Sequence, residues 1–197
     1  MKRIIIIAAL SLMTVSLSAQ SDILNALKSV ASSVVSSTVT TELKGTTWTY
    51  QGIATALRSD NVLTSAAGTA ALSSVETKIN NAFSKVGIKA GSATLKFEED
   101  GDFTMTFGKV PLTGTWSQDG TAVTIKFGKA LTYLQLDGTV STTTDGCNIL
   151  FNGEKFLEFA KKVISTTSTK SSNSTLKSLS SVITSAKSID AGFKLSK

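Results

Sequence analysis

The stretch DFTMTFGKVPLTGTWSQDGTAVTIKF, residues 102–127, decides the fold of this chain. Its large apolar side chains alternate with polar ones in two runs: Phe103, Met105 and Phe107, then Val123, Ile125 and Phe127. A period of two places each apolar set on one face of a strand and leaves the other face to water. The pair Asp119-Gly120 precedes the second run, and Asp-Gly is a preferred pair for tight hairpin turns. The stretch therefore predicts consecutive antiparallel strands.

The same pattern continues on both sides of this stretch. Apolar residues separated by a single residue recur at Leu95 and Phe97, Leu134 and Leu136, and Ile149 and Phe151. Further Asp-Gly pairs stand at residues 100–101, 137–138 and 145–146, and an additional strand opens at Gly45. A meander of this many strands must close or stack to hide its edges. The predicted fold is mainly β with peripheral helices: an antiparallel meander β-barrel over residues 45–152.

Three segments carry a helical period of 3.6 instead. Residues 62–86 predict a helical insertion in the barrel that ends at Gly87. Residues 20–44 predict an N-terminal helix followed by a linker, and residues 153–197 predict two C-terminal helices around a Ser/Thr-rich linker. The short apolar end from Gly192 to Leu195 is a candidate for the closing strand of the barrel.

Residues 1–19 have the form of a signal peptide. Lys2 and Arg3 precede an apolar run over residues 4–15, and the small residue Ala19 offers a cleavage point. The run is shorter than the roughly 20 apolar residues of a membrane-spanning helix. The alternative is a buried N-terminal strand over residues 4–12. We expect a secreted or periplasmic protein without a transmembrane segment after cleavage, and without a cysteine that could carry a lipid anchor.

The composition excludes most catalytic machinery. The 197 residues contain no His and a single Cys, so the commonest general base, disulfide frameworks and cysteine-based zinc sites are excluded. After cleavage, Arg58 would be the single remaining Arg, and the excess positive charge would come from scattered lysines without aromatic residues between them. Both features argue against nucleic-acid binding. We expect a buried, inert Cys147, no cofactor, no metal and no enzymatic activity.

Two clusters allow a catalytic or metal-binding interpretation. The carboxylates Glu98, Glu99, Asp100 and Asp102 could form a calcium loop or an acid–base pair, but a solvated hairpin turn around Gly101 is the favoured interpretation. Residues 174–177 match the Ser-x-x-Lys spacing of some hydrolases. In a segment so rich in serine, we interpret this match as chance.

Gly114-Thr115-Trp116 with its Asp-Gly hairpins, and the Gly45 to Trp48 strand followed by a helical insertion, resemble lipocalin-like domains of secreted proteins from Gram-negative gut bacteria. The resemblance covers residues 45–152 and extends toward residue 197. It implies a calycin-type barrel with the insertion covering one mouth, in a family whose members bind small apolar molecules or have no assigned role. Lipocalins also place an Arg near the C-terminus over the first Trp, and Lys194 is the candidate for that cation here.

A closed barrel of about eight strands either fills with side chains or holds one small ligand. The residues expected to face its interior are Trp48, Tyr50, Phe103, Met105, Phe107, Trp116, Val123, Ile125, Phe127 and Tyr133. The leading hypothesis is a non-catalytic protein that binds a small hydrophobic molecule among these side chains. The alternative is a structural or protein-binding module of the cell envelope with a filled core.

Overall fold

The computed structural model describes residues 40–58, 66–107, 110–167, 179 and 189–197. All of them belong to one compact unit, residues 35–197. The predicted signal peptide, the predicted helix of the N-terminal segment and the Ser-x-x-Lys match lie outside the described residues. Of the predicted helix over residues 176–186, only Leu179 is described, and it is buried.

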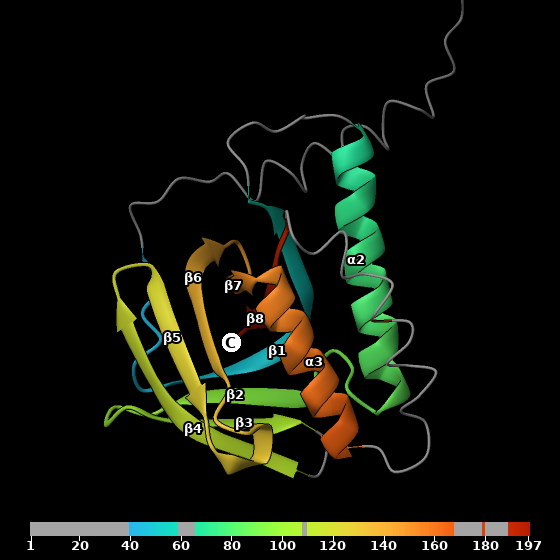
Figure 1. Cartoon of the computed structure of the whole chain (residues 1–197). Helices are drawn as coiled ribbons and strands as arrows, with labels where there is room; N and C mark the ends of the chain where they lie inside the picture. Colours follow the sequence, from blue (N-terminus) through green and yellow to red (C-terminus); the bar gives the residue numbers. More distant parts are fainter. Residues whose placement is uncertain (1–39, 59–65, 108–109, 168–178, 180–188) are drawn as a thin grey trace, which may run out of the picture. The chain divides into compact units, whose positions relative to one another are not determined.

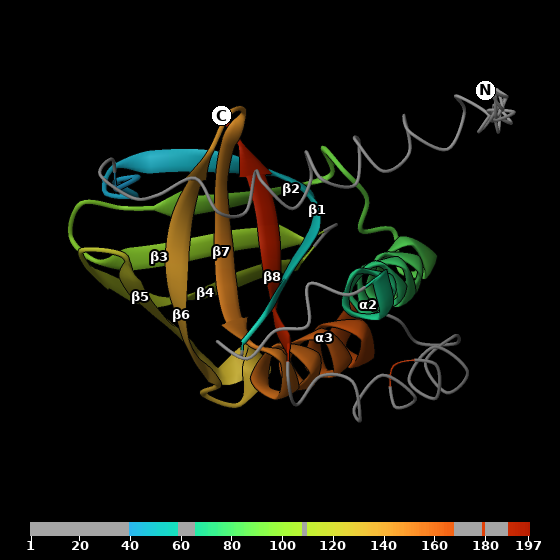
Figure 2. The ribbon, with the colours of Figure 1, turned by 90° about the horizontal axis from the view of Figure 1, so that it is seen from above.

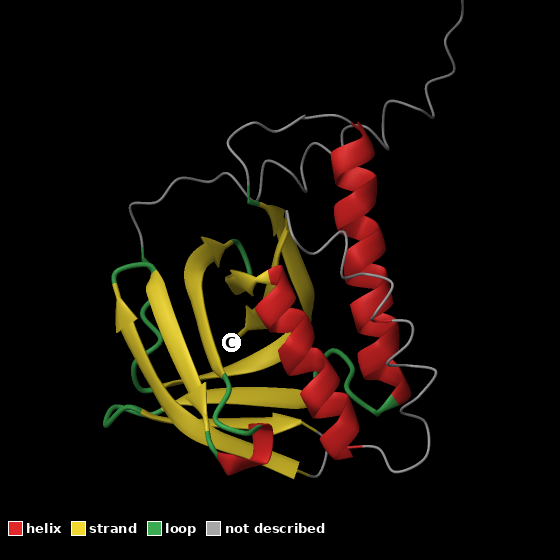
Figure 3. Ribbon diagram, viewed as in Figure 1, coloured by secondary structure: helices red, strands yellow, loops and turns green. Residues whose placement is uncertain are grey.

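Eight antiparallel strands form a closed barrel in sequence order, each paired with the next and β8 with β1 (Figures 1 and 3). Their bounds are β1 Thr46–Leu57, β2 Ala93–Phe97, β3 Asp102–Phe107, β4 Val110–Asp119, β5 Ala122–Phe127, β6 Gln135–Thr143, β7 Gly146–Asn152 and β8 Ile189–Ser196. The predicted meander barrel with peripheral helices is confirmed. The hairpins β2–β3, β4–β5 and β6–β7 lie together at one end, which we call the hairpin end.

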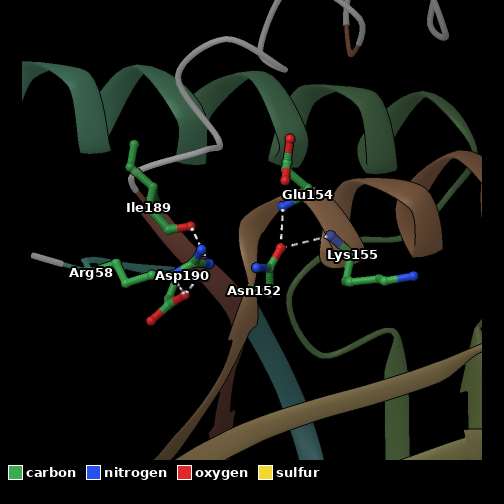
Figure 4. A network of polar contacts seen from close by, with 6 residues as sticks. All are labelled: Arg58, Asn152, Glu154, Lys155, Ile189 and Asp190. Carbon is green, nitrogen blue, oxygen red and sulfur yellow. Dashed lines mark hydrogen bonds and ion pairs between the residues drawn. The ribbon is translucent and has the colours of Figure 1, made fainter.

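Strand β8 closes the barrel. Its residues pair with β7 on one side and with β1 on the other, for example Phe193 with Ile149 and with Ile53. Gly192 permits this close approach, because a Cβ there would lie 1.8 Å from the carbonyl oxygen of Ile149. At the start of β8, Asp190 accepts hydrogen bonds from Nε and Nη2 of Arg58, at 2.9 and 2.6 Å (Figure 4). This pair ties β8 to the chain that leaves β1.

A bulge in β1 provides the docking point for α2 (Ala66–Lys85). The β1–β8 register shifts between Tyr50 and Gly52, so the Ile53 amide lies beside the bulge. Asn80 of α2 accepts hydrogen bonds at its Oδ1 from the Ile53 amide, at 3.3 Å, and from the Tyr50 hydroxyl, at 3.2 Å. The helix ends at Lys85, and Gly87 follows as its stop, with the paired backbone bonds of a Schellman motif: Ile88 N to Phe83 O and Gly87 N to Ser84 O.

Helix α3 (Gly153–Thr167) follows β7 directly. Asn152 caps it, since its Oδ1 accepts hydrogen bonds from the amides of Glu154 and Lys155 at 3.0 and 3.2 Å (Figure 4). Figures 1 and 2 show α2 and α3 side by side at the end of the barrel opposite the hairpin end, which we call the helix end. No helix in the described part of the chain is long and apolar enough to cross a membrane.

Candidate functional site

Most of the residues expected to face the barrel interior do so. Eight of the ten have exposed fractions of 3% or less: Trp48, Tyr50, Phe103, Met105, Phe107, Val123, Ile125 and Phe127. The expectation for Tyr133 is wrong, because its side chain is 75% exposed. After the short 3-10 helix η1 (Lys129–Leu131), Thr132 and Tyr133 have φ values of 57° and 55°, so the chain turns before β6 begins. Leu131 and Leu134 take the buried positions on either side.

Trp116 lies at the hairpin end and is half-buried. Its indole Nε1 donates to the carbonyl oxygen of Glu98 at 3.0 Å, and its ring meets Phe97 edge-on with centroids 5.1 Å apart. It therefore packs against the core from the rim.

Lys197, and not Lys194, provides the cation over the first Trp. The Nζ of Lys197 lies 5.2 Å from the centre of the Trp48 ring, whereas Lys194 is exposed between two buried neighbours. The expectation for Lys194 is wrong because strand alternation turns Phe193 and Leu195 inward and Lys194 outward. The position of the cation thus follows from the register of β8.

The helix end is filled by an aromatic cluster that the sequence pattern identified only in part. Its members come from four strands and both helices: Tyr50, Phe83, Phe107, Phe151, Phe156, Phe159 and Phe193. Phe193 is at its centre, with ring centroids 5.1 Å from Phe156 and 5.6 Å from Phe159. The alternation of Phe193 with Lys194 predicts an inward side chain for Phe193. No local pattern predicts that the Phe side chains of α2 and α3 also pack inside the barrel.

The interior of the barrel is packed. A side chain without accessible surface borders neither solvent nor a space wide enough for water. This holds for side chains from six of the eight strands and from α3: Leu95, Phe97, Met105, Phe107, Ile125, Leu136, Cys147, Ile149, Phe159 and Phe193. At the hairpin end, the fully buried Leu43 lies before β1, held by the hydrogen bond from its amide to Gln118 Oε1 at 3.1 Å.

Within the described interior, the titratable side chains of Tyr50 and Cys147 have raised pKa values and are neutral at neutral pH. Burial raises the pKa of the Tyr50 phenol far above its ordinary value of 10.0. Burial also raises the pKa of the Cys147 thiol to about 12, although the charge of Lys197 opposes the shift. A thiol protonated at neutral pH is a poor nucleophile, and Cys147 is fully buried.

The acidic cluster at the β2–β3 hairpin has the geometry of a turn. Glu98 pairs with Lys96 at 2.5 Å, and Asp100 Oδ1 accepts a hydrogen bond from the Asp102 amide at 3.2 Å. Gly101 supplies the positive φ of 93° that the turn requires. Among the described residues, no group of three or more Cys, Asp or Glu is placed to hold a metal ion.

The described residues line at least two grooves on the outer surface. One, of about 450 Å³, includes Arg58, Asp137, Asn152 and Asp190 in its lining. The other, of about 350 Å³, lies at the hairpin end and is lined by Thr40, Glu42, Lys44, Trp116, Gln118 and Gly120. We call the second the Trp116 groove.

Comparison with protein-family models matches residues 19–197 to a family described as lipocalin-like domain, DUF4923. The chain belongs to this lipocalin-like family. The match spans the barrel, α2, α3 and β8, so the resemblance predicted from the sequence is confirmed. Neither the curated proteins nor the solved structures gave a match.

Proposed function

We propose that this lipocalin-like protein is a non-catalytic module that recognises its partner through its outer surface, with the barrel as a packed scaffold. Among the described residues, the inward side chains of the barrel are almost completely buried, and this observation carries the proposal. Small-molecule sites are usually pre-formed clefts of about 300–1,000 Å³. A ligand inside this barrel would instead have to displace buried rings, and each buried Phe contributes about 2 kcal/mol to stability.

Titration with apolar probes tests the packed interior. Probe fluorescence and native mass spectrometry monitor the titration. We expect no saturable binding of ANS or palmitate to the native protein. Phe159→Ala is the positive control, because removing this fully buried ring should leave a dry cavity that takes up benzene. One-to-one binding of palmitate by the unsubstituted protein would overturn the proposal.

One observation favours a small hydrophobic ligand as the second candidate. Phe83, Phe156 and Phe159 belong to α2 and α3, not to the strands, so displacement of the helices would empty the helix end. Asn80→Ala removes the contact that docks α2 on the β1 bulge. Under this second function, the substitution should increase palmitate affinity, because opening then costs less. Under the packed-scaffold function, it should lower stability without creating saturable binding.

We also propose that the protein works outside the cytoplasm, in the cell envelope or beyond it. The basic start, the apolar run and Ala19 support this location. Expression of the full chain in a Gram-negative host, followed by fractionation and N-terminal sequencing, tests it. We expect a product that begins at Gln20 outside the cytoplasm; an unprocessed cytoplasmic product would contradict export.

A further inference from the structure

One side of the Trp116 groove is the segment before β1, in which buried and exposed residues alternate. Leu43 is fully buried, while its neighbours Glu42 and Lys44 are exposed and line the groove. Two charged groups, one of each sign, are therefore presented to the same space beside an indole ring. Of these three residues, only Leu43 packs into the core.

The groove is held rigidly. Gln118 fixes the segment before β1, since its Nε2 donates to the carbonyl oxygen of Thr41 at 2.9 Å and its Oε1 accepts from the Leu43 amide. Thr41 is anchored further by a 2.7 Å hydrogen bond between its hydroxyl and that of Thr142. Trp116 is fixed through its Nε1 and its edge contact with Phe97. The backbone of the groove and the Trp116 ring are therefore in place before a ligand binds, which lowers the entropic cost of binding.

The charges of the groove are available to a ligand. Among the described residues, neither Glu42 nor Lys44 has an ion-pair partner within 4.0 Å, although other charged side chains at this end are paired, such as Lys96 with Glu98. A carboxylate beside an indole suits an organic cation, because the ring face attracts positive charge. An ammonium group suits an anion. Both groups on one groove complement a ligand that carries both charges.

We propose that the Trp116 groove binds a small zwitterion, with its ammonium group against Trp116 and Glu42 and its anionic group against Lys44. The volume of about 350 Å³ is at the lower end for small-molecule sites and fits a compact ligand. This assignment rests on the proposed function, in which recognition takes place on the outer surface. It places the site at the hairpin end, away from the aromatic cluster.

Calorimetric titration of the full processed chain tests the groove. The probes are glycine betaine and phosphocholine, which differ in their anionic group, with choline and acetate as single-charge controls. We expect saturable binding of at least one zwitterion, clearly weaker binding of choline and acetate, and weakening by salt. Choline binding as tightly as the zwitterions would overturn the role of Lys44, and no binding of either zwitterion would overturn the site.

Surface substitutions locate the binding. We expect Glu42→Gln and Lys44→Gln each to weaken zwitterion binding about threefold to fivefold, the size of an exposed ion pair. Glu154→Gln is the matched control, an exposed carboxylate on α3 at the other end of the barrel. Trp48→Phe leaves Trp116 as the only tryptophan of the chain, and binding of a zwitterion should change the tryptophan fluorescence of this variant. Equal affinity of Glu42→Gln and the unsubstituted protein would refute the assignment.

Vesicles of phosphatidylcholine distinguish a lipid headgroup from a free solute. Co-sedimentation that Glu42→Gln abolishes would identify the headgroup as the source of the zwitterion, and binding of free probes alone would identify a solute. The palmitate titration reports separately on the barrel interior. A failure of surface recognition and a failure of this groove assignment therefore give different results.

Discussion

Thr132 and Tyr133 are the described non-glycine residues with positive φ, at 57° and 55°. For a β-branched residue such as Thr132, this backbone conformation is a strained outlier. The buried side chains of Leu131 and Leu134 anchor the strained turn in the core. In addition, the Nζ of Lys162 donates a hydrogen bond to the carbonyl oxygen of Leu131 at 3.2 Å. Tertiary anchoring thus overrides local preference at this point.

Thr132→Gly should stabilise the protein by about 0.5–1 kcal/mol. Glycine removes the roughly 1–2 kcal/mol cost of the left-handed conformation in the folded state. Part of this gain is offset, because glycine also increases the conformational entropy of the unfolded chain. Thr132 is exposed, so few contacts are lost. Urea denaturation measures the difference. Thr113→Gly, an exposed position in extended β4, is the control and should destabilise; a loss of stability in both variants would contradict the strain.

Gly114 of β4 shows a steric requirement of the opposite kind. A Cβ at this position would lie 2.0 Å from the backbone oxygen of Lys126. We expect Gly114→Ala to cost about 3 kcal/mol, because β5 must move to accept the methyl group. Gly120→Ala, with φ of 55° but no atom within 4 Å, should cost only about 1 kcal/mol. Equal thermal midpoints of the two variants would show that β4 and β5 are not so close.

At the scale of elements, α3 depends on its cap. Asn152→Ala removes the acceptor for two amides of the first turn and should cost about 1 kcal/mol. Asn152→Asp keeps a capping oxygen and should retain most of the stability. Thermal unfolding followed by circular dichroism compares the two variants. If Asp is as harmful as Ala, Asn152 contributes through contacts other than the cap.

The strands could be predicted from the sequence, whereas the helix docking could not. Alternation over Phe103–Phe107 and Val123–Phe127 specifies which side chains face inward, because a strand has a period of two. The bulge at Gln51 adds one residue to β1, and the acceptor for the Ile53 amide comes from Asn80, 27 residues away. The inward orientation expected for Tyr133 is wrong for a similar reason. The conformation of the loop before β6 depends on long-range contacts, such as the hydrogen bond from Lys162 to Leu131.

For the whole molecule, sequence pattern left open whether the barrel is filled or hollow. Tyr50, Phe107 and Phe127 have the same inward orientation in both cases. The difference comes from Phe83 and Phe159, which the helices insert among the rings of the strands. The Trp116 groove could not be predicted from the sequence either, because its lining combines the segment before β1 with the end of β4.

Cys147 makes the stability of the whole barrel sensitive to alkaline pH. Its folded pKa of about 12 exceeds the ordinary value of 9.0, so the folded state retains a proton that the unfolded state loses. The stabilisation is complete below pH 9 and is lost as pH rises toward 12. Between pH 8 and 10, before Tyr50 contributes fully, we expect the free energy of unfolding to fall by about 1 kcal/mol more than in Cys147→Ala. Urea titrations at each pH measure this difference, and parallel curves for the two proteins would show that the thiol is not buried.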